Sequence, residues 1–290
     1  MEQAATKSVT INGAQLAYRL VGPANAPLIV TLHGGRGFGD HKSDFQAFLP
    51  LSSDYRLLSF DLRGHGRSSR TEPYSFRQLV EDIEGLRRYF VGGEKPCIIC
   101  GGSFGGFFAQ QYAITYPSHV SHLILRGTAP SHHHEAEAIQ VLEARIHRAP
   151  GLSTGMLRDK IFGQFDSDLE FQLIMYAAAP LYSESFDADI ALRRNIDTVF
   201  YAKSHNDLYA EPEKLFDYRD SLSTVTAKTL IIVGERDWIC PPAQSRVIAS
   251  LIPDSRLEII QNANHSVHIE KNAEVIGHIR KHLIQPAELS

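Results

Sequence analysis

The stretch CIICGGSFGGFF, residues 97–108, decides the fold, because an apolar run ends there at one serine, Ser103, enclosed by four glycines. The run CIIC has the composition of a buried strand, and the segment FGGFFAQQYAITY after the serine has that of a helix. A serine between strand and helix in the pattern G-x-S-x-G is typical of a nucleophile elbow, a strained turn whose glycines avoid Cβ clashes. The helix also points its free N–H groups toward the serine. We therefore predict that Ser103 is a nucleophile, and a glycine-rich turn that only connects two elements is the less favoured alternative.

Apolar runs rich in β-branched residues recur on both sides of this stretch, each followed by turn residues and a helical pattern. Their apolar residues are continuous rather than alternating, so we expect strands that are covered on both faces. This predicts an α/β fold with a mostly parallel sheet and helices on both faces. An N-terminal hairpin is predicted over residues 8–22, with its turn at Asn12 and Gly13. The predicted strands are 28–33, 55–60, 97–100, 122–127, 229–234 and 256–261, and the main predicted helices are 75–90, 243–252 and 274–284.

The strand rhythm is missing between about residues 129 and 220. Compact domains rarely hold more than ~15 residues without secondary structure, so this segment cannot be a simple loop. Helical patterns occupy residues 135–148 and 168–179 and are broken at Pro150, Gly151 and Pro180. We predict that residues 129–220 form an inserted helical cap, and that residues 1–128 and 221–290 form the core.

A serine nucleophile needs a base and an acid that orients the base. Asp237 lies just beyond the strand TLIIVG, and His265 lies in the loop after the last strand. The carboxyl ends of parallel strands are where catalytic groups collect in such sheets, which favours both residues. Asp207 is a rival acid, but it belongs to the cap. His268 is a rival base, but it lies three residues later, where a structural histidine is expected.

The loop HGGRGFG, residues 33–39, directly follows the strand LIVTL and predicts an oxyanion hole. Backbone must approach a substrate closely there, which glycine permits. We assign the two donors to the N–H of Gly35 and the N–H of Phe104, the residue after the serine. Phosphate binding is not favoured, because the pattern G-x-x-x-x-G-K-[ST] is absent.

The composition gives no sign of a nucleic-acid or membrane partner. The net charge is −4, and no stretch approaches the ~20 apolar residues that span a bilayer. The N-terminal residues lack the apolar centre of a signal peptide, so we expect a soluble, cytoplasmic protein. Cys97 and Cys100 should face opposite sides of a strand, and the adjacent side chains of residues 132–134 (HHH) diverge, so we expect no metal and no cofactor.

The motifs HGGRG, DLRGHGRSS, GGSFGG, GERDWICPP and NHSVHIE together resemble the α/β-hydrolase superfamily, and more narrowly its proline iminopeptidase-like branch. The resemblance implies an α/β-hydrolase fold, the triad Ser103, Asp237 and His265, and a mainly structural role for the loop DLRGHGRSS. Proline iminopeptidases usually have proline where Arg36 stands, and they bind the substrate's amino group partly through a W-x-x-W-E motif in the cap. The single tryptophan of this chain, Trp238, lies outside the cap.

These observations predict a serine hydrolase that transfers an acyl group to water. The expected substrate is a small, partly apolar ester, lactone or amide; a proline iminopeptidase-type aminopeptidase is the alternative, and a ligand-binding receptor without catalysis is the second alternative. The partner is a small molecule, and the sequence does not indicate an oligomeric state. The residues expected to line the pocket are Phe38, Phe104, Tyr176, Tyr182 and Tyr201. The acidic residues expected to be mostly solvated cap surface are Glu135, Glu143, Asp166, Asp168 and Glu184.

Overall fold

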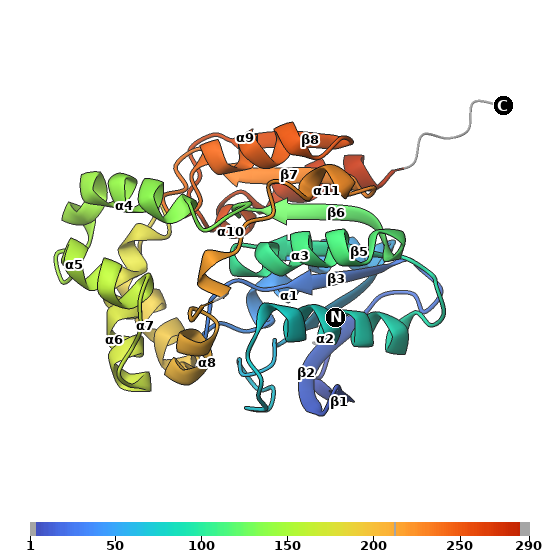
Figure 1. Cartoon of the computed structure of the whole chain (residues 1–290), viewed down its shortest axis with the longest axis horizontal. Helices are drawn as coiled ribbons and strands as arrows, with labels where there is room; N and C mark the ends of the chain where they lie inside the picture. The colour runs from blue at the N-terminus through green and yellow to red at the C-terminus, as the bar shows by residue number, and fades with distance from the viewer. Residues whose placement is uncertain (1–3, 212, 285–290) are drawn as a thin grey trace.

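A single eight-stranded sheet runs through the molecule in the order β1-β2-β4-β3-β5-β6-β7-β8 (Figure 1). The computed structural model describes residues 4–211 and 213–284. All strand pairs from β4 to β8 are parallel, and only β1–β2 and β2–β4 are antiparallel. The strands are β1 (Lys7–Ile11), β2 (Ala14–Val21), β3 (Leu28–Leu32), β4 (Arg56–Phe60), β5 (Cys97–Gly102), β6 (Val120–Arg126), β7 (Lys228–Gly234) and β8 (Ser255–Ile260). The predicted α/β-hydrolase sheet is confirmed.

The N-terminal hairpin turns where the sequence predicts. Asn12 and Gly13 have φ angles of 46° and 78°, the left-handed conformation that a two-residue hairpin turn requires at both central positions. The turn sets the register of β1 against β2, in which Ile11 pairs with Ala14. Both side chains are buried, so the hairpin adds its inner face to the core.

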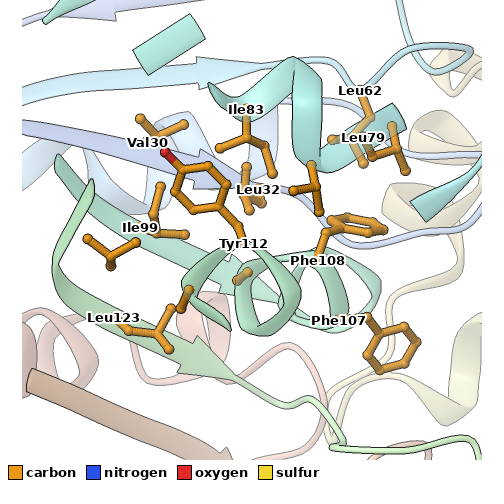
Figure 2. Close-up of a cluster of buried hydrophobic side chains, with 14 of the residues drawn as sticks. Val30, Leu32, Leu62, Leu79, Ile83, Ile99, Phe107, Phe108, Tyr112 and Leu123 are labelled. Carbon is orange, nitrogen blue, oxygen red and sulfur yellow. The ribbon is translucent and has the colours of Figure 1, made fainter. Parts of the chain in front are cut away.

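Helices cover both faces of the sheet, and the two faces have separate apolar clusters. The core helices are α1 (Lys42–Phe48), α2 (Phe76–Phe90), α3 (Phe104–Thr115), α9 (Pro242–Leu251), α10 (Val267–Glu270) and α11 (Asn272–Leu283). Figure 2 shows the cluster between the sheet and α2 and α3, which contains Val30, Leu32, Leu79, Ile83, Ile99, Phe108 and Tyr112. Cys97 belongs to this cluster and Cys100 to the opposite one, as the strand periodicity predicts. The two thiols therefore cannot act as a pair.

Among the described residues, the segment between β6 and β7 contains no strand of the sheet and is largely helical. Figure 1 shows these helices gathered beyond one end of the sheet. They are α4 (His134–Arg145), α5 (Thr154–Met156), α6 (Asp168–Ala178), α7 (Ala188–Asp197) and α8 (Ala202–Asp207). Two isolated bridges tie this segment to the core, Phe38 with Phe200 and Ser131 with Asp217. The division at residues 129 and 220 stays a prediction.

The loop DLRGHGRSS is held by buried ion pairs and hydrogen bonds. Arg63 donates from Nε and Nη2 to the two oxygens of Asp82 in α2, at 2.7 and 2.8 Å, and both side chains are buried. Asp61 accepts the backbone N–H of His41 and of Arg67, each at 2.7 Å. These contacts fix the loop beside the turn after β3, which gives it the structural role that the family resemblance implies.

No helix within residues 4–211 and 213–284 is both long and apolar enough to cross a lipid bilayer. The cytoplasmic location stays a prediction.

Candidate active site

Ser103 occupies a strained turn between β5 and α3. Its φ and ψ angles are 53° and −123°, a conformation that a residue with a side chain rarely adopts. Its N–H is fixed by a 2.8 Å hydrogen bond to the carbonyl of Arg126 on β6. The turn is tightly enclosed, since a Cβ atom on Gly105 would lie 2.1 Å from the carbonyl oxygen of Leu32. The chain folds this way here because only glycine leaves room for α3 to pack against β3.

Asp237 and His265 form a hydrogen-bonded pair at the carboxyl ends of β7 and β8. Nδ1 of His265 donates to Oδ2 of Asp237 at 2.8 Å, and the carboxylate is 2% exposed. The other oxygen, Oδ1, accepts the backbone N–H groups of Ile239 and Cys240 at 3.1 and 3.0 Å. These bonds orient the imidazole with its proton on Nδ1, so Nε2 is left as the basic nitrogen.

Ser103 and His265 line one cavity of about 790 Å³, and Asp237 is buried behind His265. The cavity lies between the carboxyl ends of the strands and the helices inserted after β6, with residues of both on its walls. A cavity of this size, lined by apolar and polar side chains, suits a small, partly apolar molecule.

The loop after β3 runs beside Ser103, and both assigned oxyanion donors belong to residues that line the cavity. A Cβ atom on Gly34 would lie 3.0 Å from that of Ser103, and Gly35 has a φ of 89°. Within the described parts of the chain, neither the N–H of Gly35 nor that of Phe104 donates a hydrogen bond. Both donors are therefore available to a developing oxyanion.

Two histidines hold this loop in place through hydrogen bonds to its backbone. Nε2 of His65 accepts the N–H of Gly37 at 2.8 Å, and Nδ1 of His205 on α8 donates to the carbonyl of Arg36 at 3.0 Å. Burial lowers the pKa of each histidine to about 3, so both are neutral near neutral pH. The neutral ring of His65 can accept from Gly37 only because its proton is on Nδ1, which donates to the carbonyl of Arg63.

The rival acid and base lie in other surroundings. Asp207 forms an ion pair with Lys203 of α8 at 2.7 Å. His268 accepts a hydrogen bond from Arg126 on its Nδ1 at 2.8 Å and stacks on Phe48. Neither contacts the pair of Asp237 and His265 through a hydrogen bond among the described residues, which agrees with the weaker ranking of both rivals.

The structure places three of the five aromatic residues expected in the pocket on the cavity wall: Phe38, Phe104 and Tyr182. Tyr176 and Tyr201 are not among the described lining residues, so the structure does not bring them together with the other three. The ring of Tyr201 packs instead on Tyr74 and under Arg70. Tyr176 follows the lining residue Met175 on α6, and one step along a helix turns the side chain by about 100°.

Several lining residues were missed by the sequence analysis. The cap contributes aromatic side chains, among them Phe165, Phe171 and His134. Phe165 stacks on Phe171, which in turn packs against Phe38 in the loop after β3. Arg36 also lines the cavity. The sequence did mark Arg36 as unusual, because it stands in HGGRG where proline iminopeptidases usually have proline. The lining residues of the cap have no such local signature, since their orientation depends on how the helices pack.

The acidic residues of the cap divide into two groups. Glu143, Asp166 and Asp168 are exposed, as expected. Glu184 is instead held by Arg145, Arg148 and Arg236 and by the amide of Asn264, next to His265. Glu135 is partly buried and accepts the hydroxyl of Tyr209 at 2.6 Å, and burial raises the pKa of its carboxyl. Over the part of the chain that the structure describes, no group of three or more potential ligands could hold a metal ion.

The elbow, the strand order and the inserted helices together define an α/β-hydrolase. The family model of the α/β hydrolase fold matches residues 27–272, and the chain belongs to this family. Within the family it belongs to the proline iminopeptidase-like branch, and it is a hydrolase. The chain is 62% identical to the proline iminopeptidase PfmaB of Pestalotiopsis fici over 275 residues, which covers 95% of this chain and 98% of that one. It is 26% identical to the proline iminopeptidase of Lactobacillus helveticus over 293 residues, which covers 95% of this chain and 96% of that one.

Solved structures show the same fold. The meta-cleavage product hydrolase CumD of Pseudomonas fluorescens aligns with a TM-score of 0.74 at 22% identity and covers 95% of this chain and 97% of its own. At this identity the likeness shows the fold alone.

Proposed function

We propose that the protein is a serine hydrolase in which Ser103, His265 and Asp237 act as a catalytic triad. The observation that carries the proposal is that a serine on a strained elbow and a histidine bound to a buried aspartate line one cavity. Ser103 supplies the nucleophilic oxygen, and Nε2 of His265 removes its proton. Asp237 orients the imidazole and stabilises its charged form.

The proposed reaction has two halves. In the first, Ser103 attacks a carbonyl carbon, and the oxyanion accepts the N–H groups of Gly35 and Phe104. His265 then donates the proton to the leaving group, and an ester forms between the acyl group and the serine. In the second, His265 activates a water molecule, which releases the acyl group and regenerates the serine.

The test is the variant Ser103→Ala. We expect kcat to fall by roughly 10⁴-fold or more, because the residues of a triad depend on one another. Ser250, an exposed serine of α9 that is not among the described lining residues, provides the matched control Ser250→Ala, which should retain activity. A serine-reactive phosphonate should label Ser103 in the unchanged protein. Full activity of Ser103→Ala would refute the assignment, and the absence of turnover on every substrate would support the receptor alternative.

The first candidate for the substrate is a peptide with N-terminal proline. The names of the relatives support it, since a 62% identical protein and several more distant ones are called proline iminopeptidases. This reverses the ranking that the sequence analysis gave to the two substrate classes. The decisive pair is proline 4-nitroanilide and its N-acetyl form, which differ in the free amine. An aminopeptidase should cleave the free form at least about 100-fold faster, because its site recognises the ammonium group.

The second candidate is a small ester or lactone, and the charges on the cavity wall favour it. Recognition of an ammonium group needs an available carboxylate. Of the three carboxylates among the described lining residues, buried Asp44 is bound to Arg126 at 2.8 Å and Asp40 is paired with Lys42. The third, Asp197 at the end of α7, is exposed to solvent, where an ammonium group gains little from it. Cleavage of 4-nitrophenyl esters together with equal rates on the two anilides would establish this candidate and refute the first.

A further inference from the structure

Arg36 lines the cavity, and its guanidinium group lies close to two aromatic rings. Its central carbon is 5.2 Å from the ring centroid of Phe104 and 4.4 Å from that of Tyr209. Arg36 follows Gly35 in sequence and contacts the ring of Phe104, so the cation is next to both assigned oxyanion donors, to one along the chain and to the other in space. Ser103 and Arg36 line the same cavity, so one small substrate can contact both side chains.

Within the part of the chain that the structure describes, the charge of Arg36 has no ion-pair partner. Among residues 4–211 and 213–284, its side chain makes no hydrogen bond and no ion pair, and its Nε is buried without an acceptor. Arg63 and Arg87, which are fully buried, are bound by the carboxylates of Asp82 and Glu84, each through two N–H groups. Arg36 is half-buried, and a charge that has lost part of its hydration without gaining a partner is unfavourable. Such groups are conspicuous where a ligand completes the site.

The nearby carboxylate does not fill this role. Glu135 accepts the hydroxyl of Tyr209 at 2.6 Å and forms no ion pair with Arg36. The ring of Tyr209 instead lies against the guanidinium group. Burial lowers the pKa of Arg36 to about 10, which still leaves the group charged near neutral pH.

We propose that Arg36 binds a carboxylate of the substrate, beside the carbonyl group that Ser103 attacks. The planar guanidinium group and a carboxylate match through two parallel hydrogen bonds, and the aromatic rings hold the plane in position. The inference rests on the proposed function and narrows its substrate class. In the first candidate the carboxylate is the free C-terminus of a dipeptide Pro-Xaa, and in the second it is carried by the ester.

Matched substrates test the charge alone. One pair is the dipeptide Pro-Phe and its C-terminal amide, and the other is 4-nitrophenyl hydrogen glutarate and 4-nitrophenyl pentanoate. On one of the pairs, the unchanged protein should prefer the carboxylate by about 100-fold in kcat/KM, the effect of a buried charge-assisted pair. The preference should vanish in Arg36→Met, which keeps the length without the charge, and should survive in part in Arg36→Lys.

The control is Arg70→Met, because Arg70 also stacks on a tyrosine, Tyr201 at 4.1 Å, but does not belong to the described cavity wall. It should leave the preference unchanged, and melting curves verify that each variant is folded. An equal rate on charged and neutral substrates in the unchanged protein, or a preference that persists in Arg36→Met, would overturn the proposal.

A binding measurement separates this proposal from the proposed chemistry. In Ser103→Ala, calorimetry should find that Pro-Phe binds more tightly than Pro-Phe amide, or that glutarate binds more tightly than its diamide. The additional change Arg36→Met should abolish that difference in affinity. If Arg36 affects binding while the unchanged protein turns nothing over, the carboxylate site stands and the triad fails. If turnover depends on Ser103 but neither carboxylate binds better than its amide, the triad stands and the carboxylate site fails.

Discussion

Oδ2 of Asp237 accepts the Nδ1 proton of His265 at 2.8 Å, while Oδ1 is fixed by two backbone N–H groups of the loop after β7. The carboxylate therefore has little freedom to rotate away from the imidazole. Gly127 is part of the same arrangement, since a Cβ atom there would lie 2.8 Å from Oδ2 of Asp237. The glycine that follows β6 thus leaves space for the carboxylate of Asp237, which follows the neighbouring strand β7.

The variant Asp237→Asn should lower kcat by about 10³ to 10⁴-fold. An amide at this position can donate to Nδ1, which favours the tautomer whose proton is on Nε2 and cannot accept one from Ser103. The matched control is Asp207→Asn, which changes the rival acid on α8. Steady-state kinetics on the best substrate compare the two variants. A larger loss in Asp207→Asn than in Asp237→Asn would exchange their roles.

Acid should destabilise the protein through His65. Burial lowers the pKa of His65 in the folded state to about 3, below the ordinary value of 6.5, so the unfolded chain binds a proton first. Stability is then fully present above about pH 6.5 and is lost as the pH falls from there toward 3, by on the order of 1 kcal/mol per pH unit. His65→Gln keeps an acceptor for Gly37 but does not titrate. Urea unfolding between pH 7 and 4 should give a flatter dependence for it, and exposed His147→Gln should leave the dependence unchanged.

The buried pair of Arg63 and Asp82 should be costly to break on one side only. Asp82→Asn leaves a buried guanidinium group with less compensation, and we expect the free energy of unfolding to fall by about 3 kcal/mol. Lys160 and Asp166 form an exposed pair at 2.9 Å, so Asp166→Asn should cost less than about 1 kcal/mol. Denaturant unfolding of both variants gives the comparison. Equal losses would mean that burial does not determine the effect.

Two glycines in helices should respond to alanine in opposite directions. In Gly105→Ala the new Cβ would lie 2.1 Å from the carbonyl oxygen of Leu32, so α3 must shift away from β3, at a cost of at least about 3 kcal/mol. In Gly277→Ala of α11 the new Cβ meets no atom within 4 Å, and the better helix propensity should stabilise by about 1 kcal/mol. Thermal and denaturant unfolding report both signs. A tolerated Gly105→Ala would show that the elbow has more room than its geometry indicates.

The sheet was predictable from the sequence because each buried strand has its own continuous apolar run, and the turn residues Asn12 and Gly13 mark the hairpin directly. The elbow and the positions of Asp237 and His265 were predictable from the same apolar runs, because each of these residues follows the end of a recognisable strand. The cap was different. Tyr201 is turned away by its packing on Tyr74, and Arg36 is turned inward between Phe104 and Tyr209, and no local pattern encodes either orientation. Contacts between distant segments decide such side chains.

The inserted helices leave and rejoin the sheet at a single place. β6 and β7 are neighbours in the sheet, and the antiparallel contact of Ser131 with Asp217 closes the excursion between them. The entropy of closing such an excursion depends only weakly on its length. Helices within it can be lost, gained or exchanged between lineages without disturbing the register of the strands that position Ser103, Asp237 and His265. In this architecture the substrate can therefore change while the catalytic residues stay in place. The two ends of the insertion, after β6 and before β7, are the points at which protein engineers could exchange these helices to alter substrate specificity.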